Sequence, residues 1–248
     1  MKKDIILAGV GGQGILTIAT IIGDAAANAG INLKQAEVHG MSQRGGDVQS
    51  NLRLSTETIH SDLIKDGCAD LIISMEPMEA LRYVPSLAKG GCVVTSSHPF
   101  KNIPNYPDEE ALAQELNNLP HVVSLPIEDV ARENNAPKSA NIILLGMAAK
   151  YIEILTPEQL RNSIARVFAS KGDKIIEMNQ KAFDAGQNAN KLFPKMKIFS
   201  EELVEKAVKE LHIAALSRAT IGEVLLVAQY LEKETGIPFI RMDQGSPG

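Results

Sequence analysis

The chain has 248 residues, a formal net charge of -5 and 44% hydrophobic residues, which is typical of a globular α/β domain with a smaller appendage. Only 4% of its residues are aromatic and no basic stripe is present, which argues against a nucleic-acid partner. The apolar run at the N-terminus is short and is interrupted by glycines, which argues against a membrane span.

The cysteine content limits the redox chemistry of this chain. Its two cysteines, Cys68 and Cys92, form no Cys-x-x-Cys pair and have no histidines at metal-ligand spacing, so we expect small buried groups and no metal site. Iron–sulfur clusters generally need four thiolates, so the chain cannot hold one alone. Two cysteines without a secretory signal favour the reducing cytoplasm.

Strands are predicted from short apolar segments bounded by turn residues. The segment 47–54 alternates between apolar and polar residues, which predicts a half-exposed, antiparallel strand. The strand near residue 91 is expected to begin after a turn at Gly90-Gly91. The remaining predicted strands cover residues 4–8, 32–38, 69–74, 91–96 and 121–126.

Helices fill the intervals between these strands and continue after the last one. Gly30 is expected to end the first helix, and Thr156 with Pro157 to begin a later one. Asn141 is interpreted as a helix cap. The predicted helices cover residues 15–29, 75–87, 108–118, 127–135, 142–155, 156–168, 172–191, 199–211 and 217–236.

This order of elements predicts an α/β fold, and the strands at 4–8 and 32–38 with the helix between them predict a βαβ start. We expect a Rossmann-like, mostly parallel sheet with flanking helices and a helical C-terminal extension. The expected boundaries are an α/β domain at residues 1–192, a helical extension at 198–236 and a flexible tail at 237–248.

A glycine loop follows the first predicted strand. Gly9, Gly11, Gly12, Gln13 and Gly14 fit the G-x-G-x-x-G pattern that lets a helix N-terminus approach a phosphate. The dinucleotide hypothesis also requires an acid at the end of the second strand, and Glu37 occupies that place. The alternative is that the glycines only allow the first helix to pack closely, and the pattern alone does not decide between the two.

A second polar loop, residues 39–46, follows Glu37 and leads into another strand. It should lie at the carboxyl end of the sheet beside the glycine loop, where open α/β sheets bind ligands. His39 is a candidate acid or base and Arg44 a candidate anion ligand, while Ser42 and Gln43 are candidates for orienting a polar ligand. Because no nucleophile–base pair accompanies them, an interface or supporting role is favoured over catalysis.

Glu76 and Glu79 form a second candidate pair one helical turn apart. Paired carboxylates can exchange protons with a substrate. A solvated helix face is the more common reason for such spacing, and it is the favoured interpretation here.

Three ordered motifs together resemble a known family: VGGQG, EVHGMSQRGGDVQSNLRLS and ADLIISMEPMEALRYVPSLAKGG. They are similar to the gamma-type domain of pyruvate/ketoisovalerate (2-oxoacid):ferredoxin oxidoreductases, in particular to the small (beta) subunits of the indolepyruvate type. The resemblance covers about residues 3–192, and the helices from about 198 onward are not part of it.

The resemblance implies an enzyme that oxidatively decarboxylates a 2-oxoacid with coenzyme A and reduces ferredoxin. It implies that thiamine diphosphate and iron–sulfur clusters are bound by a large partner subunit, and that this chain is a cofactor-free subunit, inactive alone. It assigns no catalytic residue. Two alternatives stay open: a stand-alone NAD(P)-binding protein with Glu37 holding the ribose, and a non-catalytic docking module.

Overall fold

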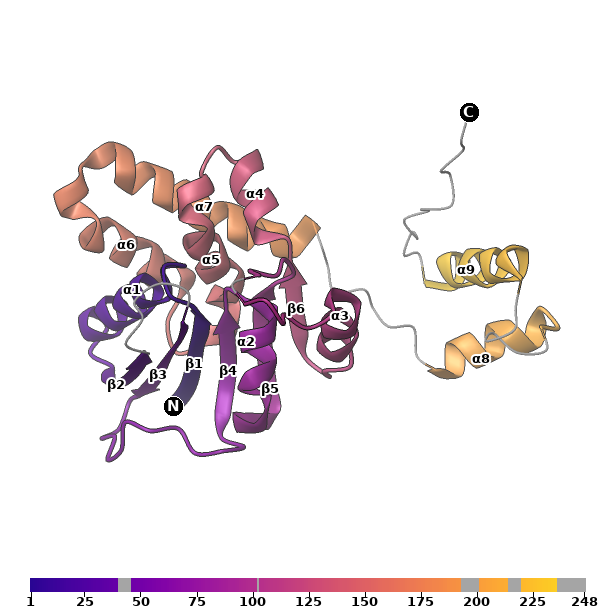
Figure 1. Cartoon of the computed structure of the whole chain (residues 1–248), viewed down its shortest axis with the longest axis horizontal. Helices are drawn as coiled ribbons and strands as arrows, with labels where there is room; N and C mark the ends of the chain where they lie inside the picture. Colours follow the sequence, from indigo (N-terminus) through magenta and orange to yellow (C-terminus); the bar gives the residue numbers. More distant parts are fainter. Residues whose placement is uncertain (40–45, 102, 193–200, 214–219, 236–248) are drawn as a thin grey trace. The chain divides into compact units, whose positions relative to one another are not determined.

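The computed structural model describes residues 1–39, 46–101, 103–192, 201–213 and 220–235. These residues belong to two compact units, Met1–Pro194 and Lys195–Gly248 (Figure 1). Both units are described below, each by itself.

The first unit is built on a six-stranded sheet with the order β2-β3-β1-β4-β5-β6. β1, β4, β5 and β6 are parallel neighbours, and β3 pairs antiparallel with both β1 and β2. The antiparallel direction of β3 confirms the prediction made from its alternating pattern. The strands are β1 (Lys2–Val10), β2 (Asn32–His39), β3 (Asp47–Ser55), β4 (Ala69–Ser74), β5 (Leu87–Ser96) and β6 (Val122–Leu125).

The position of β3 distinguishes this sheet from a dinucleotide-binding one. The chain returns from β2 through a hairpin, and β3 then occupies the place beside β1, with Val10 opposite Asp47 and His39 opposite Val48. Since neighbouring strands lie about 4.8 Å apart, β2 is roughly 10 Å from β1. The expected βαβ start, with β2 beside β1, is therefore wrong.

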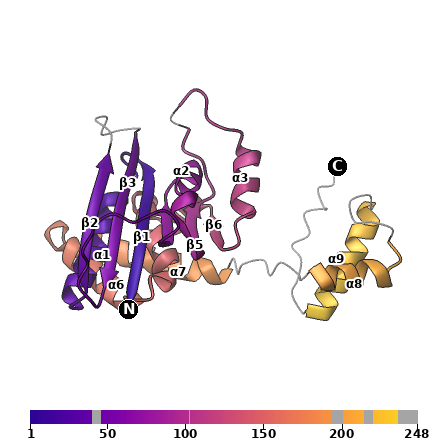
Figure 2. The same cartoon turned by 90° about the horizontal axis from the view of Figure 1, so that it is seen from below.

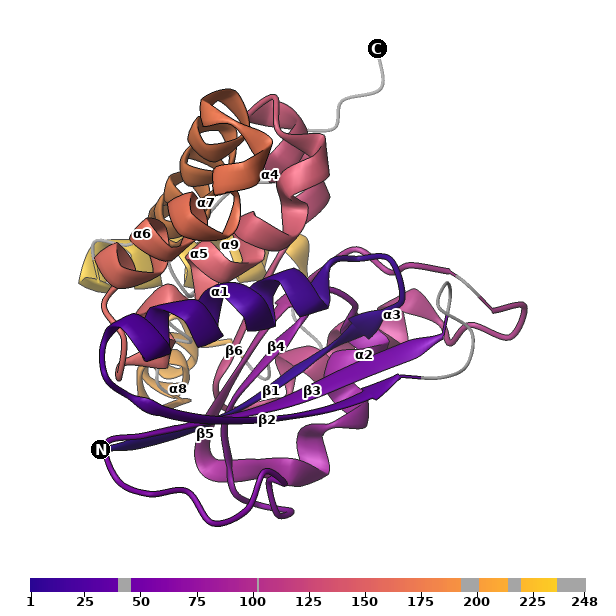
Figure 3. The same cartoon turned by 90° about the vertical axis from the view of Figure 1, so that its left-hand side faces the viewer.

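Helices cover both faces of the sheet (Figure 3). Alternate residues of β1 face opposite sides, so Ile5 and Leu7 pack with α1 and α5, whereas Ile6 packs with α2 and α3. The α-helices of this unit are α1 (Ile15–Asn28), α2 (Pro77–Arg82), α3 (Glu109–Asn117), α4 (Ile127–Glu133), α5 (Ala140–Ile152), α6 (Pro157–Val167) and α7 (Asp173–Leu192). Short 3-10 helices are η1 (Val84–Ser86), η2 (Pro137–Ser139) and η3 (Ala169–Lys171).

Helices α5 and α7 approach each other at backbone distance. A Cβ atom on Gly146 would lie 2.1 Å from the Phe183 carbonyl oxygen, and one on Gly186 would lie 2.1 Å from the Ile143 carbonyl oxygen. Only glycine fits at these two positions. The close crossing fixes α5, whose N-terminal turn reaches the glycine loop.

Several predicted boundaries are confirmed and others are wrong, including that of the helix expected at 75–87, whose α-helical part is Pro77–Arg82. Thr156 and Gln159 form a capping box at the start of α6, and Gly30, with φ +69°, follows the end of α1. The expected turn at Gly90-Gly91 is absent because β5 continues through it; the register shifts there, and a Cβ on Gly91 would lie 2.8 Å from the Ala69 carbonyl oxygen. The helix expected to reach residue 155 ends at Ile152, because Glu153 has φ +59°.

The second unit contains helices α8 (Glu201–Glu210) and α9 (Ile221–Thr235), as the amphipathic patterns predicted. Its small apolar cluster consists of Ala207, Ile213, Val227 and Leu231. The Tyr230 hydroxyl donates to the Glu210 carboxylate at 2.8 Å, which joins the two helices. The tail expected at 237–248 lies outside the described residues. Within the described ranges, no helix is both long and apolar enough to cross a membrane.

Candidate functional site at the carboxyl end of the sheet

The glycine loop, residues 9–14, joins β1 to α1 as a closed turn. The Val10 backbone N–H donates to the Gln13 side-chain oxygen at 2.7 Å, and a Cβ on Gly9 would lie only 2.9 Å from that oxygen. Gly14 precedes α1 with φ +81°, a conformation that favours glycine. The Gln13 side chain therefore closes the turn from within the loop.

Asn141 holds the glycine loop from α5. Its side-chain amide donates to the Gly14 carbonyl oxygen at 3.1 Å, and a Cβ on Gly14 would lie 2.6 Å from the amide nitrogen. The interpretation of Asn141 as a helix cap is wrong, because Ser139 is the residue at the N-cap of α5. Local sequence could not reveal this contact, since its partners are 127 positions apart.

The two polar loops meet at the same end of the sheet. The Gly11 backbone N–H donates to the Gly46 carbonyl oxygen at 2.8 Å. This hydrogen bond joins the glycine loop to the last residue of the second polar loop, as expected from the sequence. The backbone of His39 ends β2, but its side chain lies outside the described residues. Ser42, Gln43 and Arg44 also lie outside the described residues, so their roles stay predictions.

Glu37 is poorly placed for a ribose. It is an exposed residue of the edge strand β2, opposite Ser50 of β3. A ribose-binding acid stands next to the glycine loop, whereas here β3 separates the two. The geometry argues against the dinucleotide hypothesis.

Glu76, which follows β4, is fully buried. One carboxylate oxygen accepts the Glu79 backbone N–H at 2.8 Å, and the other accepts the Tyr106 hydroxyl and the Phe100 backbone N–H, the latter at 3.4 Å. Burial raises the pKa of Glu76 above its ordinary 4.5, although these hydrogen bonds favour the charged form. The carboxyl group thereby ties the end of β4 to the connection between β5 and α3.

Glu79 is also buried and binds Arg82, whose Nε lies 2.7 Å from a carboxylate oxygen. The favoured interpretation of Glu76 and Glu79 as a solvated helix face is therefore wrong. The α2 helix packs against β4 and α3, so the side chains of its first turn are covered. A signal in the sequence was available, since Glu76 follows directly after a buried strand.

His98, for which the sequence predicts no functional role, lies in a loop at this end of the sheet. Its Nδ1 is 3.6 Å from a Glu128 carboxylate oxygen and its Nε2 is 3.4 Å from one of Asp129. The Ser96 hydroxyl donates to Glu128 at 2.9 Å. These contacts connect the end of β5 to α4.

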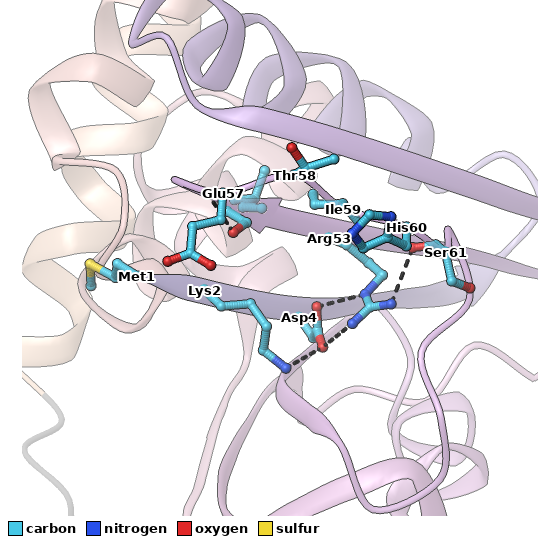
Figure 4. A pocket seen from close by; sticks show the side chains of 11 residues that line it. Met1, Lys2, Asp4, Arg53, Glu57, Thr58, Ile59, His60 and Ser61 are labelled. Atoms are coloured by element: carbon cyan, nitrogen blue, oxygen red, sulfur yellow. Dashed lines mark hydrogen bonds and ion pairs between the residues drawn. The ribbon is translucent and has the colours of Figure 1, made fainter.

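A pocket of about 510 Å³ lies at the opposite end of the sheet, lined by residues of β1, β3 and the segment after β3 (Figure 4). Asp4 lies buried in its wall and binds both Arg53, through two nitrogens at 2.9 and 3.1 Å, and Lys2, at 2.8 Å. The remaining Arg53 nitrogen donates to the carbonyl oxygens of Ser61 and Leu63.

Burial alone would raise the pKa of Asp4, but the hydrogen bonds from Arg53 and Lys2 outweigh burial and lower it from its ordinary 3.8. These charges satisfy one another and fasten the segment after β3. We therefore assign the amino-end pocket a structural role and place the candidate site at the carboxyl end.

The described residues contain no group of three or more His, Cys, Asp or Glu side chains arranged to hold a metal ion. Cys92 is buried as expected, but Cys68 is exposed, so the expectation for Cys68 is wrong. Cys68 immediately precedes β4, outside the apolar segment that forms the strand.

Comparison with known proteins identifies the family. Residues 4–189 match the family "Pyruvate ferredoxin/flavodoxin oxidoreductase". The chain belongs to this family. This confirms the resemblance inferred from the three motifs, and the chain is accordingly a subunit of an oxidoreductase.

Relatives and solved structures agree with this membership. The chain is 36% identical to indolepyruvate oxidoreductase subunit IorB of Thermococcus kodakarensis over 77% of its own length and 98% of the relative's. The fold matches the gamma subunit of keto/oxoacid ferredoxin oxidoreductase from Geobacter sulfurreducens, with a TM-score of 0.55, 19% identity, and coverage of 75% of this chain and 94% of that one.

The fold also matches 2-oxoglutarate:ferredoxin oxidoreductase from Magnetococcus marinus, whose structure contains 2-oxoglutarate, coenzyme A and succinyl-CoA. The TM-score is 0.59 at 20% identity, and the match covers 98% of this chain but 43% of that one. The fold of this family therefore also occurs within longer chains.

Proposed function

We propose that this chain is the small subunit of an indolepyruvate-type 2-oxoacid:ferredoxin oxidoreductase. The carrying observation is the 36% identity that extends over 98% of the IorB relative. In this proposal the complex decarboxylates an aryl 2-oxoacid, transfers the acyl group to coenzyme A and passes the electrons to ferredoxin. A large subunit binds thiamine diphosphate and the iron–sulfur clusters, which supply the redox chemistry.

In this proposal the chain contributes its carboxyl-end loops to the assembled enzyme. The glycine loop supports the surface, because its turn is closed by Gln13 and its position is set by Asn141. The proposed contacts to substrate, coenzyme A or the large subunit are His39, Ser42, Gln43 and Arg44.

We propose residues 1–192 as the family domain, 198–236 as a helical extension and 237–248 as a tail. Neither Cys68 nor Cys92 forms a disulfide, which suits the proposed cytoplasmic location.

Reconstitution tests this function. Dye reduction dependent on indolepyruvate and coenzyme A is measured with this chain alone, with the large subunit from the same organism alone, and with the two together. Activity only in the mixture supports the proposal. A mixture without activity, together with NAD(P) binding by this chain that Glu37→Ala abolishes, would overturn it in favour of the nucleotide-binding alternative.

The loop residues are tested in the same assay. If the 39–46 loop contacts the reacting molecules, Arg44→Ala lowers the kcat of the assembled complex. If the loop only docks the partner, the same variant weakens subunit affinity and leaves the kcat of the assembled complex unchanged. His39→Gln tests proton transfer in the same assay. If His39 transfers a proton, replacing its imidazole with an amide that does not titrate flattens the pH profile of kcat near neutral pH.

A further inference from the structure

The connection between β5 and α3 is an anchored segment that extends beyond the ends of the strands (Figure 2). We call residues 97–101 and 103–108 the arm. At its start, the His98 backbone N–H donates to the Ser96 hydroxyl at 3.1 Å. At its end, Asp108 caps α3 by accepting the Ala111 backbone N–H at 3.0 Å.

The middle of the arm is fastened to the buried carboxyl group of Glu76. Tyr106 donates its hydroxyl to this group, and the Phe100 backbone N–H points to the same oxygen. Because Glu76 is fully buried and also accepts the Glu79 backbone N–H, it provides a rigid attachment point. The Glu76 carboxyl group therefore attaches the arm at Phe100 and Tyr106.

The arm exposes two large apolar side chains. Phe100 is 48% exposed and Ile103 is 38% exposed. A single exposed apolar residue is ordinary on a protein surface. Two on one short segment that a buried carboxylate holds in place are typical of interface anchors, since aromatic and aliphatic side chains dominate binding energy when their position is fixed in advance.

The surroundings of the arm are acidic. The exposed residues Asp108, Glu109 and Glu110 begin α3, and Glu128 and Asp129 begin α4. Among the nearby cations of the described residues, Lys101 pairs with Glu109 and Arg132 pairs with Asp129. We call these five acidic residues the acidic rim. A symmetric contact between two copies of this chain would place the two acidic rims against each other, and the repulsion between like charges is unfavourable.

We propose that the arm binds the large subunit of the complex, with Phe100 and Ile103 entering an apolar socket bordered by lysine or arginine side chains. This rests on the proposed function. Two features of the molecule select this partner: its acidic rim disfavours a second copy, and its fold also occurs inside a longer oxidoreductase chain. Tyr106 and Glu76 are positioning residues, because they act on the partner only through the arm.

Binding of the full chain to the purified large subunit tests the proposal. The double variant Phe100→Ser/Ile103→Ser is expected to raise Kd at least thirtyfold. Tyr106→Phe removes one hydroxyl and should raise Kd several-fold while leaving the apolar anchors intact. The control is Leu63→Ser, an apolar position at the other end of the sheet that is more exposed (60%) than either anchor, and it should leave Kd within twofold.

Two further measurements make the result decisive. Circular dichroism and thermal melting establish that each variant is folded. The association rate of the wild type is measured between 50 and 500 mM salt, and it should fall with salt if basic groups meet the acidic rim.

The outcomes separate this inference from the proposed function. If the wild-type subunits reconstitute activity but the folded double variant binds as tightly as the wild type, the arm is not the docking surface and the function stands. Equal weakening by Leu63→Ser would also overturn the arm as a specific surface. If the wild-type chain neither binds nor activates the large subunit, both proposals fall. Self-association that the double variant abolishes would replace the large subunit with a second copy.

Discussion

The amino and carboxyl ends of the sheet use buried carboxylates in different ways. At the amino end, Asp4 binds two cations, and Arg53 uses its remaining nitrogen on the segment after β3. At the carboxyl end, Glu76 instead accepts hydrogen bonds from the backbone and from the Tyr106 hydroxyl. The first arrangement fastens the fold to itself, whereas the second holds a segment that presents apolar groups outward.

The comparison shows why the pocket at the amino end is not the candidate site. The pocket of about 510 Å³ lies at the amino end, where the charged groups are already paired. The carboxyl end carries the glycine loop, the 39–46 loop and the arm. In open α/β sheets this end binds ligands because loops of variable sequence meet there above a rigid sheet.

The largest expected loss of stability comes from a change at the amino end of the sheet. Asp4→Ala removes a fully buried carboxylate and leaves Arg53 without its main partner. Removing one member of a buried ion pair costs about 4 kcal/mol of unfolding free energy, which urea denaturation measures. The matched control is Lys2→Ala, since Lys2 is half exposed and its loss should cost well under 1 kcal/mol. If the ends are separate in function, the folded fraction of Asp4→Ala binds the large subunit normally.

The next effect lies in the glycine loop at the carboxyl end. Gly14 has a positive φ, and the Cβ added by Gly14→Ala would lie 2.6 Å from the Asn141 amide nitrogen. The substitution should therefore lower the free energy of unfolding by about 3 kcal/mol. Gly12 has φ +101° but open space around it, so Gly12→Ala should cost about 1 kcal/mol from backbone strain alone. Equal losses in urea denaturation would show that the Asn141 contact is unimportant.

A smaller loss of stability is expected when Asn141 is replaced. Asn141→Ala removes the hydrogen bond to the Gly14 carbonyl and should cost about 1 kcal/mol. The same change makes room for a Cβ on Gly14, so the double variant Gly14→Ala/Asn141→Ala should lose less than the sum of the single losses. A thermodynamic cycle from four denaturation curves measures this coupling, and strict additivity would contradict the packing described here.

The smallest expected effect is a difference between Asp4 and Glu76 in how each makes the free energy of unfolding depend on pH. The folded pKa of Asp4 is lowered from 3.8, so its stabilisation is complete above pH 3.8 and is lost as the pH falls through the folded pKa. The folded pKa of Glu76 is raised above 4.5, so the folded state holds that proton more tightly. The cost of ionising Glu76 is therefore present at neutral pH and is relieved as the pH falls through its folded pKa toward 4.5.

Urea denaturation from pH 3 to 7 distinguishes the two carboxyl groups. The stability difference between wild type and Asp4→Asn should narrow only below pH 3.8. The difference between wild type and Glu76→Gln should instead change above pH 4.5, with wild type gaining relative stability as the pH falls. Parallel pH profiles for the two variants would contradict the contrast between the ends of the sheet.

Local patterns in the sequence were enough to predict most elements of this fold and its family. Apolar segments bounded by glycine gave strands near 4–8 and 69–74, the alternation at 47–54 gave an antiparallel strand, and Thr156-Pro157 marked a helix start. These signals are local, because hydrophobic period and capping depend on neighbouring residues. The three ordered motifs were sufficient to indicate the family.

The tertiary structure was needed to show how distant segments meet. It placed β3 between β1 and β2, which removes Glu37 from the glycine loop. It brought Asn141 to Gly14 and Tyr106 to Glu76, across separations of 127 and 30 residues. Such contacts depend on strand order and on helix packing, and a single sequence carries no local signal for either. The physical reason is that burial and hydrogen bonding are satisfied by the whole fold, so a buried glutamate and an exposed one can share the same local pattern.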